Sequence, residues 1–156
     1  MWQKMLQIGS GGESSNEHYL FKNGLVSGIE WCASGSSTSS YTMPVYGVTE
    51  GSILNNQLVC NAIYGGWVLV GLNNPISLKG YSKLKFEGTY NGDATARIIV
   101  SKYKNCRDNS YDEYNISSLA NYELDLGKYQ DTEYYYIGLT VINVGDIHCD
   151  VLSLLK

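Results

Sequence analysis

The stretch that decides the fold runs from Ile76 to Lys104 and reads ISLKGYSKLKFEGTYNGDATARIIVSKYK. Leu84, Phe86 and Tyr90 alternate with charged or polar neighbours. Because successive side chains of an extended strand point to opposite faces, this pattern gives one apolar face and one face that meets water. The segment is therefore predicted to form a half-buried β-strand.

The chain then turns and returns. Residues 91–93 (Asn-Gly-Asp) are a turn signal, because Asn and Gly accept the positive φ that a tight turn requires. After the turn, Ala96, Ile98 and Val100 again share one face. We therefore expect a β-hairpin at the centre of the fold.

Short strands separated by turn signals also account for the rest of the chain. The sequence predicts strands or strand pairs at 17–26, 41–48, 52–60, 67–70, 134–144 and 147–155, with loops at 33–40, 72–75 and 105–113. Turns are predicted at Asn23-Gly24 and Gly145-Asp146. Residues 116–125 fit a helical turn or a strand equally well. In the last strand, Ile147, Cys149 and Val151 are expected to face inward.

These strands predict an all-β fold, a two-sheet antiparallel β-sandwich of jelly-roll type, in preference to a barrel. Residues 1–16 read as an N-terminal strand or connector that ends in a glycine cluster, and residues 17–156 as one sandwich domain.

Charge and hydropathy argue against several classes of partner. The net charge is -4, which disfavours a nucleic-acid binder or a polybasic membrane anchor. No apolar run approaches the roughly 20 residues that span a bilayer, and the first residues lack the features of a secretory signal. We expect synthesis in the cytoplasm, with later incorporation into a virion or phage-like particle left open. Cys32, Cys60, Cys106 and Cys149 are expected to be reduced and mostly buried.

No catalytic constellation is evident, so the sequence predicts a protein that is not an enzyme. The Gly-x-Ser-x-Gly motif is absent, and the glutamates considered as hydrolytic acids are scattered along the chain: Glu17, Glu30, Glu50, Glu87 and Glu113. His148 and Asp150 share a strand face but are interpreted as a surface pair. A hydrolase with an unrecognised carboxylate pair remains the least favoured alternative.

Aromatic rings beside amides are the feature that points to a ligand. A sugar ring can stack on an aromatic plane while Asn or Arg side chains bond its hydroxyls. The candidate glycan-binding residues are Trp31, Tyr41, Tyr46, Tyr64, Trp67, Asn73, Asn74, Tyr103, Asn105, Arg107, Asn109 and Tyr111. For each ring, the competing interpretation is a core side chain whose polar group reaches solvent.

The one cofactor to consider is a structural calcium ion. Asp108 and Asp112 lie in a polar loop whose oxygens suit Ca²⁺, although the spacing does not match an EF-hand. Asn91 and Asp93 offer a second place for such an ion.

Residues 76–86 (ISLKGYSKLKF) resemble the strand entry "apolar-x-Leu-x-Gly-Tyr-x-x-Leu-x-Phe" of jelly-roll carbohydrate-binding modules. They are also similar to β-sandwich modules in phage and prophage tail or fibre proteins of gut Firmicutes. The resemblance covers about residues 60 to 156, and no ligand-binding residue lies among the matched positions. It implies a module that binds a glycan or assembles with neighbours without doing chemistry.

Two hypotheses follow from the sequence. The first is a non-catalytic module that binds a glycan or cell-surface polysaccharide within a phage-derived tail or adhesion assembly. The second is a structural subunit that self-assembles into a homo-oligomer or larger particle and has no sugar site.

Overall fold

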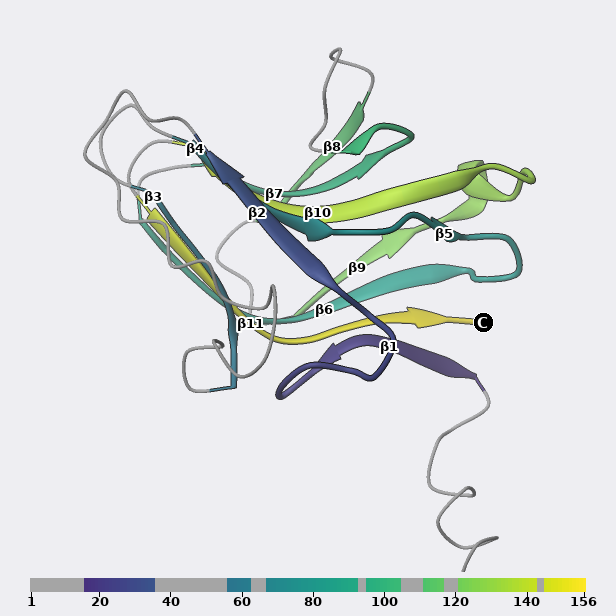
Figure 1. Ribbon diagram of the computed structural model, residues 1–156, viewed down its shortest axis with the longest axis horizontal. Helices are drawn as coiled ribbons and strands as arrows, with labels where there is room; N and C mark the ends of the chain where they lie inside the picture. The colour runs from purple at the N-terminus through teal and green to yellow at the C-terminus, as the bar shows by residue number, and fades with distance from the viewer. Residues whose placement is uncertain are drawn as a thin grey trace, which may run out of the picture.

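The chain folds into two facing β-sheets, which form the two layers of the computed structural model in Figure 1. The structure describes residues 16–35, 56–62, 67–92, 95–104, 111–116, 121–142 and 145–156. Within these ranges, residues 34–35, 61–62, 67, 92 and 95 are described by their backbone alone. All strand pairs in this part of the chain are antiparallel. The prediction of an all-β, two-sheet antiparallel sandwich is confirmed.

The five-stranded sheet is built around the C-terminal strand β11. Its order is β1-β11-β6-β9, and β3 also pairs with β11. The strands are β1 (Glu17–Lys22), β3 (Leu58–Ala62), β6 (Lys83–Gly92), β9 (Asn121–Asp125) and β11 (Gly145–Leu155).

The six-stranded sheet has β10 at its centre. Its order is β2-β4-β10-β7-β8, and the short β5 also pairs with β10. The strands are β2 (Trp31–Gly35), β4 (Trp67–Leu72), β5 (Ile76–Ser77), β7 (Thr95–Ser101), β8 (Tyr111–Asn115) and β10 (Tyr134–Ile142). A 3₁₀ turn, η2 (Gly127–Tyr129), lies between β9 and β10 in the chain.

The core lies between the sheets and is filled by alternate residues of each strand. Leu84 and Phe86 of β6 are fully buried, as are Ile98 of β7 and Leu139 of β10. A fully buried apolar side chain of this size contributes about 1.5–3 kcal/mol. The alternation predicted for β6 and β7 thus gives the correct buried faces.

The predicted central hairpin is wrong in its pairing. β6 pairs with β11 and β9 in the five-stranded sheet, whereas β7 pairs with β10 and β8 in the six-stranded sheet. The chain therefore passes from one layer to the other between these strands (Figure 1). Both apolar faces still reach the core, because they meet it from opposite sides.

A β-bulge in β11 corrects a second prediction. Cys149 pairs with Gly88 and Val151 with Glu87, so Asp150 is an extra residue on one strand. Because a one-residue shift exchanges the two faces, Leu152 joins the core cluster in place of Val151.

Three local predictions also change. Ala33–Gly35 and Tyr111–Glu113 were expected in loops but belong to β2 and β8. Gly145 and Asp146 were expected to form a turn but begin β11. The undecided segment 116–125 contains strand β9. The turn at Asn23-Gly24 is confirmed by the left-handed φ of 47° at Asn23 and by the Phe21–Leu25 bridge.

Among the described residues, Cys32, Cys60 and Cys149 are thiols that are not joined in disulfides, and the last two are buried. Burial raises the pKa of the Cys60 thiol to about 12, so it stays protonated. Cys106 lies outside the described residues. No helix in the described part of the chain has the length and apolar character needed to cross a membrane.

Candidate functional site

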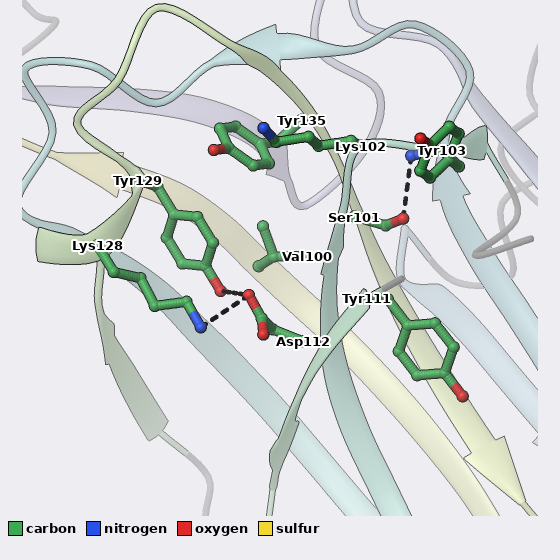
Figure 2. Close-up of a pocket in the computed structure, with 9 residues that line it drawn as sticks. All are labelled: Val100, Ser101, Lys102, Tyr103, Tyr111, Asp112, Lys128, Tyr129 and Tyr135. Carbon is green, nitrogen blue, oxygen red and sulfur yellow. Dashed lines mark hydrogen bonds and ion pairs between the residues drawn. The ribbon is translucent and has the colours of Figure 1, made fainter. Parts of the chain in front are cut away.

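An open pocket of 490 Å³ lies where β7 ends and β8 begins, beside η2 and the first residues of β10 (Figure 2). We call it the tyrosine pocket. It is lined by Val100, Ser101, Lys102, Tyr103, Tyr111, Asp112, Lys128, Tyr129 and Tyr135. This volume lies within the range of about 300–1,000 Å³ that is typical of small-molecule sites.

The register of β7 against β8 determines which side chains reach the pocket. Val100 pairs with Asp112, and Ser101 pairs with Tyr111. Since paired residues share a face, Asp112 lies on the core-facing side with Val100, and Tyr111 lies on the outer side with Ser101. The pocket therefore occupies the end of this strand pair and is lined from both of its faces.

A chain of hydrogen bonds organises the floor of the pocket. The Tyr129 hydroxyl donates to Oδ2 of Asp112 over 2.6 Å, and the Tyr114 and Tyr129 hydroxyl oxygens are 2.5 Å apart. Because the single proton of Tyr129 goes to Asp112, Tyr114 must be the donor in the second bond. Tyr114, on β8, is thereby joined to the 3₁₀ turn.

Asp112 is held as a carboxylate. Lys128 Nζ lies 2.8 Å from the same Oδ2 atom that accepts the Tyr129 proton (Figure 2). Partial burial would raise the pKa of Asp112, but the hydrogen bonds from Lys128 and Tyr129 outweigh it and leave this pKa below its ordinary value. Burial, and then the bonds to Asp112 and Tyr114, raise the pKa of Tyr129 far above its ordinary value. The phenol therefore stays neutral next to an anion.

A second tyrosine closes the pocket from β10. The Tyr135 ring packs edge-on against Tyr129, with centroids 5.1 Å apart, and its hydroxyl donates to Oδ2 of Asp131 over 2.8 Å. Burial and this bond raise the pKa of Tyr135 to about 12. Lys102 Nζ lies 5.8 Å from the Tyr135 centroid, and Lys128 Nζ lies 5.2 Å from the Tyr129 centroid. Each ring thus has one ammonium group over it.

Tyr103 supplies the exposed ring of the pocket. Its side chain is 49% exposed, and its backbone N–H donates to the Ser101 hydroxyl over 3.0 Å. This bond fixes the backbone that carries the ring, while one ring surface remains open to solvent. Such a ring can receive the apolar face of a sugar.

The structure brings some of the predicted ligand residues together. Tyr103 and Tyr111 both line the tyrosine pocket. Asn73 lies close by, because its Oδ1 accepts a bond from Lys104, the neighbour of Tyr103, and its Nδ2 donates to Glu30 over 3.0 Å. Asn74 is exposed in the same loop.

Trp31 is not a ligand residue in this structure. Its side chain is fully buried in the core, so its ring cannot stack on a sugar. Trp31 pairs with Leu72 in the sheet, and its indole lies on the core-facing side of that pair. The side chain of Trp67 and all of Tyr41, Tyr46, Tyr64, Asn105, Arg107 and Asn109 lie outside the described residues.

Sequence reasoning did not name six of the lining residues as site residues: Val100, Ser101, Lys102, Lys128, Tyr129 and Tyr135. Alternation along the predicted strand 134–144 places Tyr135 on one face with Ile137 and Leu139, but it does not show that the strand end opens to solvent. Nothing in the Gly127–Tyr129 sequence signals a 3₁₀ turn that meets β8.

The structure describes only part of the loop that was predicted to bind calcium. Asp112 is described and is paired with the Lys128 ammonium, whereas Asp108 lies outside the described residues. In the described ranges, no group of three or more His, Cys, Asp or Glu residues is arranged to hold a metal ion.

His148 and Asp150 share a face, as predicted, on the outer side of the five-stranded sheet. Gln57 joins them, because its Oε1 lies 3.2 Å from Nδ1 of His148 and its Nε2 donates to Asp150 over 2.8 Å. Nε2 of His148 lies 2.5 Å from Asp146.

Three of the glutamates considered as hydrolytic acids form ion pairs with basic side chains outside the pocket. Glu17 and Glu87 both contact Lys85, and Glu113 pairs with Arg97. Glu50 lies outside the described residues.

Comparison with known proteins finds solved structures that share this fold. No protein-family model and no curated protein matches this sequence. Solved structures do match: a mutant family 29 carbohydrate-binding module complexed with cellulohexaose has a TM-score of 0.56 at 20% identity, over 90% of this chain and 92% of that chain. A second mutant of this module, complexed with mannohexaose, has a TM-score of 0.54 at 19% identity, over 91% and 92% of the two chains.

A further mutant of a family 29 module has a TM-score of 0.51 at 19% identity, over 88% of this chain and 89% of that chain. At these identities, the similarity shows a shared fold. The chain therefore has a β-sandwich fold of the kind found in carbohydrate-binding modules, as the resemblance at residues 76–86 implied.

Proposed function

We propose that this protein is a non-catalytic glycan-binding module and that the tyrosine pocket is its binding site. The observation that carries the proposal is an open pocket whose lining combines an exposed tyrosine, Tyr103, with Lys102, Asp112 and Lys128. Aromatic surface next to fixed donors and acceptors is the combination that sugar recognition requires. The fold shared with carbohydrate-binding modules supports the same function.

The arrangement suits binding better than chemistry. Asp112 accepts hydrogen bonds from Tyr129 and Lys128 and has a lowered pKa, so it is poorly placed to act as a general acid. Glycoside hydrolysis also needs a second carboxyl across the substrate, and Asp112 is the one carboxylate among the described residues that line the pocket.

A glycan array followed by calorimetric titration tests the proposal. Tyr103→Ala should weaken binding of the best array ligand about tenfold, because it removes stacking surface worth about 1–2 kcal/mol. Tyr134→Ala is the matched control, since Tyr134 is 60% exposed and does not line the pocket.

Binding that is equally weakened in both variants would point to a site elsewhere. An array on which no glycan binds would refute the proposal as a whole.

The biological setting is a further part of the proposal. We propose that the module acts in a phage or prophage tail or adhesion assembly, as a homo-oligomer or as part of a larger particle. The support is the similarity of residues 76–86 to modules of such proteins. Tail or lysis genes beside the coding gene would favour this setting, and light scattering that gives a monomer at high concentration would argue against self-assembly.

A structural calcium ion also remains a proposal, with Asp108 and Asp112 as ligands. Unfolding temperatures measured with calcium and with a chelator test it. A higher unfolding temperature in calcium supports the ion, and equal temperatures argue against it.

A further inference from the structure

The tyrosine pocket carries more positive than negative charge among its lining side chains. Lys102 and Lys128 are its ammonium groups, and Asp112 is its carboxylate. The whole chain, by contrast, has a net charge of -4. Asp131 and Glu133 lie just outside this lining and both interact with Lys102, so the positive excess is confined to the described lining side chains.

The charge of Asp112 is largely compensated. Its Oδ2 accepts from Lys128 over 2.8 Å and from Tyr129 over 2.6 Å. A carboxylate that accepts two such bonds repels a second anion less than an unpaired one.

Lys102 is held only weakly by its protein partner. Its Nζ lies 3.9 Å from Glu133, and both side chains are about half exposed. Exposed pairs of this kind contribute about 0–1 kcal/mol. A ligand carboxylate in the pocket would therefore compete successfully for this ammonium group.

The Tyr129 and Tyr135 hydroxyls direct their protons toward carboxylates of the protein. Tyr129 donates to Asp112, and Tyr135 donates to Asp131, which lies next to the pocket without lining it. The lysines therefore supply the charged donors of the pocket. Each lies over one ring of the Tyr129–Tyr135 pair, whose centroids are 5.1 Å apart, so both ammonium groups lie along this pair of rings.

From this geometry we propose that the pocket selects an acidic sugar, a uronic acid unit whose carboxylate is bound by Lys102 and Lys128 while its ring stacks on Tyr103. The inference rests on the proposed function and adds the class of sugar. Lys102 contributes more than Lys128 to binding of the sugar carboxylate, because Lys128 already forms an ion pair with Asp112.

The test compares uronic-acid oligosaccharides with the same oligosaccharides after reduction of each carboxyl to a hydroxymethyl group. Linkage and length are thereby matched, and only the anion changes. Calorimetric titration should show the acidic form binding at least tenfold more tightly than the reduced form, and this advantage should shrink as salt is raised.

Two variants assign the effect to the pocket. Lys102→Gln should weaken binding of the acidic form about tenfold more than it weakens binding of the reduced form, because it removes one charge-assisted hydrogen bond to the carboxylate. Lys22→Gln removes a charge from β1 in the other sheet and should change neither.

The outcomes separate the two proposals. If neutral glycans bind through Tyr103 and the acidic forms bind no better, the acidic-sugar inference fails and the glycan-binding function stands. If no sugar of either kind binds, both fail. An acidic preference that survives Lys102→Gln would place the anion site elsewhere and overturn the inference.

Discussion

Tyr135 shows how one phenol ties the stability of this protein to pH. Its ring is buried against Tyr129, and its hydroxyl donates to Asp131. Its pKa is raised from 10.0 to about 12. Below pH 10 the phenol is protonated in both the folded and the unfolded chain, and its contribution to stability is complete.

Between these two pKa values, the unfolded chain loses the Tyr135 proton while the folded chain keeps it. The free energy of unfolding should therefore fall as pH rises from 10 to 12. Urea unfolding at several pH values measures this fall, which should be smaller in Tyr135→Phe. Parallel curves for the wild type and the variant would contradict the assignment.

At the residue scale, the sequence predicts which side chains are aromatic or charged but not which of them meet solvent. Trp31 and Tyr103 were equal candidates for ligand binding, yet the first is fully buried and the second is 49% exposed. The difference arises from position in the sheets: Trp31 faces the core from within β2, whereas Tyr103 follows the last residue of β7.

The bulge in β11 depends on a glycine in the neighbouring strand. A Cβ atom added to Gly88 would lie 2.1 Å from the carbonyl oxygen of His148 and 2.9 Å from Cα of Cys149. These are backbone atoms, so they cannot move aside cheaply. The bulge therefore requires glycine opposite it.

Gly88→Ala should lower the free energy of unfolding by about 2–4 kcal/mol, because the close approach of β6 and β11 would be lost. Gly71→Ala is the matched control: it also lies within a strand, but its added Cβ would have its nearest contact at 3.5 Å. We expect this control to change stability by less than about 1 kcal/mol. Equal effects of the two substitutions, measured by denaturant unfolding, would argue against the bulge.

At the element scale, alternation predicts the strands and their buried faces well. It does not predict which strands pair with one another. Leu84 of β6 and Ile98 of β7 would face a core if the two strands formed a hairpin, and they also face it from opposite sheets of a sandwich. The actual partners, β11 and β10, come from much later in the chain. The bulge at Asp150 is equally invisible to a period-two pattern, which is why Val151 was placed inward.

The whole molecule combines a scaffold with a site at one end of it. Two antiparallel sheets enclose the core, and the tyrosine pocket opens where β7, β8, β10 and η2 meet. The sandwich was predictable because it follows from alternation along each strand. The pocket was not, because its residues come from four elements that meet only after folding.

The most direct test of the central claim is a backbone amide NMR titration with the glycan that binds best on the array. If the tyrosine pocket is the binding site, the largest shifts should fall on Ser101, Tyr103, Asp112 and Lys128 and be lost in Tyr103→Ala. Shifts confined to the outer face of the five-stranded sheet, around Thr89 and His148, with the pocket amides unmoved, would contradict it.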